Sequence, residues 1–384
     1  MVKKIISIVI KKLITYFIKF NFIKKDNKKI TFISFPDLSD NSWHLFYYIN
    51  KNKNYLNLVW LIDKNLSNIK INYLKKINKK NRILFVKKRS LQGVYHFLSS
   101  RIVFFTHSSY FFSQKNLGPT QVNLWHGMPI KKIGFYRHKK HLYFYGDFTI
   151  STSNLYKKVM SKTFGINAKS VILCGLPRND VLKNNNKKKF NFLSEKKLKM
   201  VLWLPTFRKT TLFSEINDSE NEHFLDEWPN DFLKNLNLIA KQNKILLTIK
   251  LHPLDKYKKK NKKYSNISFL ENINLTNFKY DLHDLISFSD GLVSDISSVI
   301  IDYILVKKPL GITTNSLETF NRGLIGELKL FKNLKFHNIK SLNDFNIFFK
   351  KVNKSKKTNI DPKNIFYSKN AINSSKQLVE YFKI

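Results

Sequence analysis

The sequence predicts an α/β protein built from two doubly wound domains in tandem. The chain has 384 residues, more than one ordinary core requires, which suits two domains of roughly 150–200 residues each. Hydrophobic residues make up 43% of the chain and aromatic residues 14%, so globular folding is expected. Short apolar runs alternate with helical patterns, which is typical of βαβ units and a buried parallel sheet.

Seven apolar runs predict strands in the first domain, residues 29–186, and five in the second domain, residues 190–384. The first set is 30–35, 56–62, 82–86, 101–106, 121–125, 147–151 and 170–173, and the second is 199–204, 244–250, 267–270, 291–294 and 309–313. The charged, asparagine-rich segment 183–189 predicts the linker. The pattern after about residue 330 is less regular, and residues 370–382 predict a closing helix.

The N-terminal segment, residues 1–28, predicts a basic amphipathic helix that associates with a membrane surface. One face of this helix is lysine-rich, with Lys4, Lys11, Lys12 and Lys19. The other face is apolar, with Ile6, Val9, Ile10, Leu13, Phe17 and Phe20. It lacks an apolar run near 18 residues and a small-residue cleavage site, so neither a spanning helix nor a signal peptide is predicted. A packing helix with solvated lysine tips is the alternative.

Charge indicates an anionic partner. Lys and Arg outnumber Asp and Glu by 69 to 26, a formal net charge of +43, which favours nucleic acid, acidic lipid or phosphorylated substrates as partners. The single cysteine, Cys174, excludes an internal disulfide and a zinc site built on several cysteines, and it fits a reducing cytoplasm.

The first candidate site follows the fifth predicted strand. His126 stands at the strand end, where ligands bind in open α/β sheets, and its side chain suits proton transfer near neutral pH. Gly127 allows close approach of a ligand, and Trp125, Lys131 and Lys132 are further candidate site residues in the same segment. A purely structural histidine is the alternative.

Two candidate phosphate-binding segments follow strands of the second domain. Thr206 and Arg208 offer a hydroxyl and a guanidinium group, although an exposed turn is the alternative. Lys250 and His252 share one face if the strand alternation continues, and Pro253 stiffens the turn after them. His252 is the second catalytic candidate, because strand-end histidines from the two domains are expected to face each other across the cleft.

The fourth candidate segment follows the strand 291–294 and leads into a helix. Ser294, Asp295, Ser297 and Ser298 are candidate anion-binding residues, because backbone N–H groups and hydroxyls at a helix start bind anions. Plain helix capping is the alternative. Asp302 interrupts an otherwise apolar helix, so we expect it to be buried with an Arg, a Lys or a ligand hydroxyl as its partner.

Several nucleotide and metal motifs are missing from the sequence. It contains no Gly-x-Gly-x-x-Gly, Walker A, His-Glu-x-x-His or Asp-x-Asp pattern, so dinucleotide oxidoreductases, P-loop nucleotidases, zinc peptidases and metal-dependent single-domain glycosyltransferases lose support. No cofactor and no metal site is therefore expected.

Five segments, in this order, form the most specific pattern in the chain. They are Trp-His-Gly-Met-Pro-Ile-Lys-Lys-Ile-Gly (125–134), Gly-Leu-Pro-Arg-Asn-Asp (175–180), Leu-Pro-Thr-Phe-Arg (204–208), Lys-Leu-His-Pro (250–253) and Ser-Asp-Ile-Ser-Ser-Val-Ile-Ile-Asp-Tyr (294–303). Together they resemble the CDP-glycerol glycerophosphotransferase family, which builds teichoic acids and related phosphate-rich capsules. Members often have Thr in place of Met128 and an aromatic residue in place of Ile296; these departures leave the histidines and serines in place.

The resemblance implies a GT-B-like architecture, two Rossmann-like lobes around a central cleft. It implies transfer of glycerol phosphate, or a related polyol phosphate, from a CDP-activated donor to a lipid-linked anionic polymer, with release of CMP. His126 would remove a proton from the acceptor hydroxyl, while His252, Arg208, Ser297 and Ser298 would hold the donor phosphates. The expected location is the cytoplasmic face of the bacterial membrane, bound peripherally to its anionic surface.

Two other classes of protein remain as alternatives. One is a GT-B glycosyltransferase that uses a nucleotide sugar and releases a nucleoside diphosphate. The other is a nucleic-acid-binding protein, which the charge alone suggests; no recognition-helix, RNP or zinc signature supports it, so no nucleic acid is expected as a partner. Glycerol, ribitol and sugar phosphate all remain open as the transferred group.

Overall fold

The computed structural model describes most of the chain. The described residues are 23–63, 77–78, 80–107, 109–110, 118–137, 146–183, 198–206, 223–252, 263–270, 281–313, 323–326, 336–354, 365–369, 371 and 373–384. Outside them lie residues 1–22 of the expected N-terminal helix, residues 184–189 of the expected linker, Arg208 and Pro253; residues 26–28, also assigned to that helix, belong to the first strand instead. Within these ranges, no helix is long and apolar enough to span a membrane.

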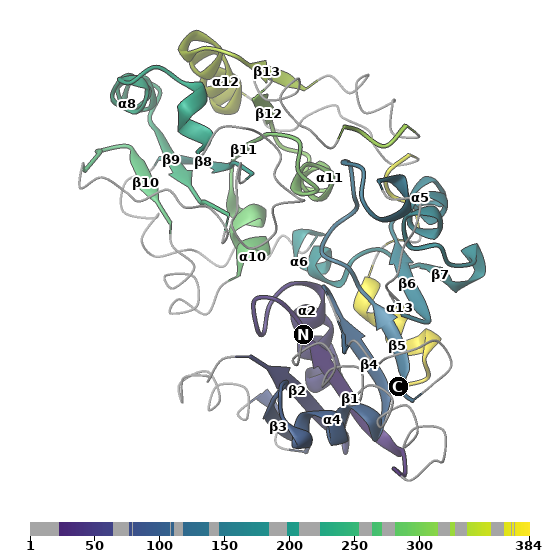
Figure 1. The fold of residues 1–384 in the computed structure, drawn as a ribbon. Helices are drawn as coiled ribbons and strands as arrows, with labels where there is room; N and C mark the ends of the chain where they lie inside the picture. The colour runs from purple at the N-terminus through teal and green to yellow at the C-terminus, as the bar shows by residue number, and fades with distance from the viewer. Residues whose placement is uncertain are drawn as a thin grey trace, which may run out of the picture. The chain divides into compact units, whose positions relative to one another are not determined.

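The first sheet has seven parallel strands in the order β3-β2-β1-β4-β5-β6-β7 (Figure 1). They are β1 (Asp26–Ile33), β2 (Asn57–Ile62), β3 (Arg82–Lys87), β4 (Ser100–Phe105), β5 (Thr120–Asn123), β6 (Phe148–Ser151) and β7 (Val171–Leu173). All seven predicted strands are confirmed. The winding direction of the chain reverses between β1 and β4, which is the place where doubly wound sheets bind ligands.

The second sheet has six parallel strands in the order β10-β9-β8-β11-β12-β13. They are β8 (Lys199–Leu204), β9 (Ile245–Ile249), β10 (Ile267–Phe269), β11 (Gly291–Ser294), β12 (Leu310–Thr313) and β13 (His337–Ile339). The five predicted strands are confirmed. Strand β13 was not predicted, because only Ile339 of its sequence His-Asn-Ile is apolar. The switch point of this sheet lies between β8 and β11.

Helices cover both sheets. The α-helices are α2 (Asp40–Asn52), α4 (Leu91–Leu98), α5 (Asn154–Phe164), α6 (Asp180–Lys183), α8 (Phe232–Gln242), α10 (Leu282–Phe288), α11 (Val299–Ile304), α12 (Leu342–Lys354) and α13 (Ser374–Tyr381). Short 3-10 turns are η1 (Gly134–Tyr136), η2 (Ala168–Ser170), η3 (Pro177–Asn179) and η5 (Phe224–Glu227). The predicted C-terminal helix is confirmed as α13.

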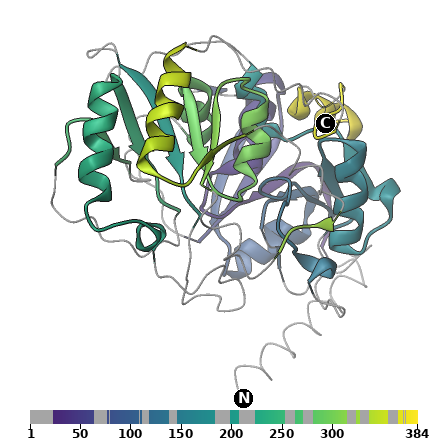
Figure 2. The same cartoon turned by 90° about the horizontal axis from the view of Figure 1, so that it is seen from above.

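Apolar cores hold the helices on the sheets. In the first sheet, Phe97 and Leu98 of α4 pack on one face, while Phe46 of α2 contacts Phe32 and Trp60 on the other. In the second, α8 and α12 lie side by side against the strands, around a fully buried cluster that includes Trp203 (Figures 1 and 2).

The chain divides into two compact units. The first comprises Met1–Met128, His138–Asp180 and Lys363–Ile384, and the second comprises Pro129–Arg137 and Val181–Pro362. The sequence analysis assigned the C-terminal residues to the second domain, whereas here they group with the first. Two contacts explain the difference: the ring of Phe382 in this tail packs on Phe104, and the Asp180 carboxylate accepts hydrogen bonds from the backbone N–H groups of Ser374 and Ser375, at 2.7 and 2.9 Å.

Candidate active site

His126 lies at the carboxyl edge of the first sheet, three residues beyond the end of β5. The side chain is half-buried, and its Nδ1 atom is 3.3 Å from the backbone oxygen of Thr106, which follows the neighbouring strand β4. A carbonyl oxygen only accepts, so this contact favours the tautomer with the proton on Nδ1. The basic lone pair of His126 is then on Nε2, as a general base requires.

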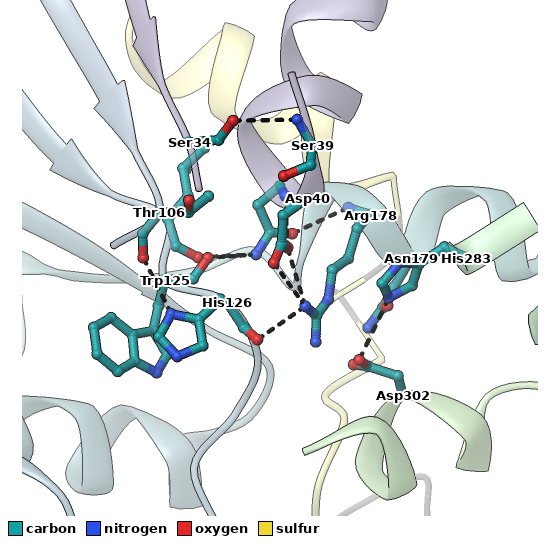
Figure 3. Close-up of polar contacts among 12 residues, drawn as sticks. Ser34, Ser39, Asp40, Thr106, Trp125, His126, Arg178, Asn179, His283 and Asp302 are labelled. Carbon is teal, nitrogen blue, oxygen red and sulfur yellow. Dashed lines mark hydrogen bonds and ion pairs between the residues drawn. The ribbon is translucent and has the colours of Figure 1, made fainter. Parts of the chain in front are cut away.

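Two aromatic contacts fix the His126 ring. Its centroid is 4.1 Å from that of His107 with a 10° angle between the planes, and 4.1 Å from that of Trp125 at 33° (Figure 3 shows the Trp125 side). Thr106 also bonds the His107 ring, with 2.9 Å between Oγ1 and Nδ1. The sequence analysis missed His107, although it directly follows an apolar strand, the same signal that identified His126.

The other acceptor-side candidates divide between the two units. Gly127 belongs to the first and has φ of +125°, a conformation that glycine adopts without strain. Lys131 and Lys132 belong to the second. Lys131 is 8% exposed and pairs with Leu324 in an isolated antiparallel bridge, while Lys132 is exposed.

Thr206 and Asp295 meet at the switch point of the second sheet. Thr206 follows β8, Asp295 follows β11, and the Thr206 hydroxyl donates to the Asp295 carboxylate at 2.9 Å. The Thr206 backbone N–H also lies 3.0 Å from this carboxylate, and Asp295 is fully buried. Ser294 is fully buried too, and its hydroxyl donates to the Leu204 oxygen at 2.7 Å. These contacts join the two strand ends.

Ser297 and Ser298 are half-buried and precede helix α11. The sequence analysis placed both serines at the start of the helix, and the structure places them directly before it, because α11 begins at Val299. Ser298 is the N-cap residue and makes no side-chain capping hydrogen bond. Capping therefore does not account for the Ser298 hydroxyl.

Lys250 and His252 follow β9, which ends at Ile249. The strand alternation that predicted a shared face stops before them: Lys250 is 7% exposed, whereas His252 is exposed. The Lys250 ammonium lies 3.4 Å from the Leu251 oxygen. Burial lowers the pKa of Lys250 to about 8, because the low-dielectric interior disfavours its charged form.

Asp302 is fully buried on α11, as the sequence predicted. Its carboxylate lies 3.6 Å from Nε2 of the buried His283 in helix α10 (Figure 3). An Arg, a Lys or a ligand hydroxyl was expected here, so the identity of this partner differs from the expectation. The sequence contains no local signal for it, since His283 and Asp302 come from separate helices.

The structure has two doubly wound parallel sheets, with an oriented histidine beyond a strand end of the first and a buried lysine beyond a strand end of the second. The chain belongs to the CDP-Glycerol:Poly(glycerophosphate) glycerophosphotransferase family, whose model matches residues 14–374. Its members are transferases.

Relatives of known activity act in teichoic acid synthesis. A teichoic acid poly(glycerol phosphate) polymerase of Bacillus spizizenii is 23% identical over 344 residues, which cover 79% of this chain and 78% of the relative. A teichoic acid glycerol-phosphate primase of Bacillus subtilis is 26% identical over 170 residues, which cover 44% of this chain and 40% of the relative.

Solved structures of the wall teichoic acid polymerase TagF share the fold. One has a TM-score of 0.70 at 18% identity, covering 100% of this chain and 95% of that chain. Another, a variant soaked with CDPG, has a TM-score of 0.66 at 17% identity, covering 94% of this chain and 89% of that chain. The fold with two parallel sheets predicted from the sequence is therefore similar to that of TagF.

Proposed function

We propose that this chain transfers glycerol phosphate, or a related polyol phosphate, from a CDP-activated donor to a hydroxyl group of a teichoic acid or capsule-type polymer. The observation that carries the proposal is the family match over residues 14–374, which includes every candidate site residue. The relatives favour a polyol-phosphate donor over the nucleotide sugar of an ordinary glycosyltransferase.

In the proposed reaction, the acceptor hydroxyl oxygen attacks the distal phosphorus of the donor. A new P–O bond forms, the P–O bond to CMP breaks, and CMP leaves with the electron pair. The acceptor proton goes to Nε2 of His126, whose lone pair the Thr106 contact supports. No metal or cofactor takes part in this proposal.

We propose that the donor phosphates bind at the carboxyl edge of the second sheet. Lys250 is the buried cation of this edge, and His252, Ser297 and Ser298 are the more accessible groups beside the strand ends. Arg208 completes the set as a sequence-based proposal. The strand ends that carry this site are joined by two hydrogen bonds: the Thr206 hydroxyl bonds Asp295, and the Ser294 hydroxyl bonds the end of β8. Asp302 and its partner His283 hold α11 from its buried side.

Incubation of the purified protein with CDP-glycerol, CDP-ribitol and UDP-sugars tests the proposed function. CMP release from a CDP-alcohol, in proportion to labelled polymer formed, is the expected result, and EDTA is expected to leave the rate unchanged. Nucleoside diphosphate release from a UDP-sugar, without CMP release from any CDP-alcohol, would replace the proposal with the glycosyltransferase alternative. Loss of activity in EDTA that Mg²⁺ restores would contradict the metal-free step.

Replacing both Ser297 and Ser298 with alanine is expected to lower kcat/KM for the donor at least about tenfold, because hydrogen bonds to charged groups contribute roughly 1.5–3 kcal/mol. Ser287→Ala is the matched control: this half-buried serine of α10 donates to the Asp284 oxygen at 2.6 Å. Unchanged donor kinetics in the double variant, with a thermal shift by CDP-glycerol equal to that of the wild type, would remove both serines from the site.

We propose peripheral attachment to the cytoplasmic face of the membrane through residues 1–25. Deleting this segment is expected to weaken cosedimentation with anionic liposomes more than it lowers turnover on a short soluble acceptor, because such binding combines apolar insertion with charge attraction. Equal liposome binding with and without the segment would assign it a packing role.

A further inference from the structure

The segment Gly-Leu-Pro-Arg-Asn-Asp (175–180) has no role in the reaction as described so far. Its Arg178 lies in the turn η3 and is only 5% exposed. We propose that Arg178 is a positioning residue, which holds the loop that carries His126 in the conformation needed for proton transfer. The inference rests on the proposed function, in which His126 is the base.

Arg178 bonds the His126 loop and an acidic partner with the same nitrogen (Figure 3). Its Nη1 donates to the backbone oxygen of His126 at 2.9 Å and to the two carboxylate oxygens of Asp40 at 3.0 and 3.2 Å. The side chains of the pair are 6% and 17% exposed. Little water therefore competes for these charge-assisted hydrogen bonds, and the His126 carbonyl has a fixed donor.

Asn41 extends the contact to the two preceding residues of the loop. It is fully buried, and its Nδ2 donates to the backbone oxygens of Leu124 at 3.0 Å and Trp125 at 2.9 Å. Its Oδ1 accepts from the Arg178 backbone N–H at 3.1 Å. Three successive carbonyls of the loop therefore accept hydrogen bonds from Asn41 or Arg178. We call these two residues and Asp40 the loop clamp.

The backbone held by the loop clamp is strained. Trp125 has φ of +50°, in the left-handed region that bulky side chains rarely adopt. Such conformations persist only where surrounding contacts over-determine them, and they concentrate at functional sites. The clamp supplies these contacts on one side of the loop, and the Asn123 Oδ1 atom accepts from the Trp125 N–H at 2.9 Å.

Relaxation of Trp125 would displace the imidazole of the next residue. The His126 ring depends on its stacking with His107 and on the 3.3 Å contact with Thr106, and both require the present backbone position. Misplacement of a reacting group by about 1 Å costs on the order of 100-fold in rate. The clamp therefore acts on the chemical step through the loop, without contact between Arg178 and the reacting atoms.

The double variant Arg178→Met with Asp40→Asn tests this role. It removes both charges together, so no unpaired charge is left buried. Asn also tolerates the left-handed conformation of Asp40, whose φ is +59°. We expect a folded protein with kcat lowered about 100-fold and an unchanged KM for CDP-glycerol. Lys29→Met is the matched control, because Lys29 is a 7% exposed cation that bonds Ser99 at the amino end of the same sheet.

Hydrogen exchange measured by mass spectrometry provides a second readout that requires no substrate. Peptides covering 120–130 are expected to exchange faster in the double variant, while those covering 199–206 and 245–250 keep the wild-type rate. A folded double variant with wild-type kcat, or a slower one with unchanged exchange in 120–130, overturns the proposal. If the double variant does not fold, Asn41→Leu is measured with the same criteria. If wild-type protein releases no CMP, the proposed function fails, and the exchange data still decide whether the clamp holds the loop.

Discussion

Replacing His126 with alanine is expected to lower kcat by a factor of about 100 to 10,000, the usual contribution of a positioned general base. The ring is half-buried and lies beyond the carboxyl end of β5, so its removal is expected to leave the fold intact. The KM of the donor is expected to change little, because the proposed donor groups come from the second sheet. Single-turnover measurement of CMP release compares the chemical steps directly.

His337→Ala is the matched control for this variant. His337 is also half-buried and also contacts a backbone carbonyl, with 2.9 Å between its Nε2 and the oxygen of Asp344, but it belongs to β13 at the edge of the second sheet. Its removal is expected to leave kcat unchanged. Wild-type turnover in a well-folded His126→Ala protein would remove His126 from the role of base.

Lys250→Met is expected to lower donor kcat/KM roughly 10- to 150-fold at pH 7, which corresponds to the loss of one charge-assisted hydrogen bond of about 1.5–3 kcal/mol. The pH dependence is the sharper measurement. Burial lowers the pKa of Lys250 to about 8, and a bound phosphate favours the ammonium form, so the pKa must rise on donor binding. Donor binding by the wild type is then expected to weaken as the pH rises above about 8.

Two comparisons isolate Lys250 in this experiment. Lys250→Arg stays protonated at every pH used and is expected to lose the decline that begins near pH 8. Without donor, the unfolded state binds more protons than the folded state between pH 8 and the ordinary lysine pKa of 10.5, so the stability of the wild type relative to Lys250→Met should rise over that interval. A pH profile shared by the wild type and Lys250→Arg would exclude Lys250 from the donor site.

The sequence was sufficient to predict twelve strands of the two sheets and to select the polar residues at their ends as candidates. Buried parallel strands are apolar over their whole length, so twelve of them are readable as runs, and polar residues directly after such runs are candidates for chemistry. His126, Thr206 and Lys250 were found in this way. Strand β13 was not predicted. His107 was also missed, although it is a polar residue directly after an apolar strand.

The sequence could not predict which unit the C-terminal helix joins. An amphipathic pattern shows that α13 has one apolar face, but it does not specify which sheet that face covers. The packing of Phe382 on Phe104 decides it. The same reasoning explains why residues 129–137 were assigned to the first domain, since a boundary inside a loop leaves no periodic signal.

The sequence by itself determined the class of fold, the family and the candidate groups for the proposed transfer. Tertiary structure alone decided how these groups are supported. Arg178 reaches Asp40 across 138 positions of the chain, and Thr206 reaches Asp295 across 89. The burial that lowers the pKa of Lys250 is likewise a property of the folded chain. Apolar periodicity is a local property, whereas partners and desolvation depend on which strand ends the folded sheets bring together.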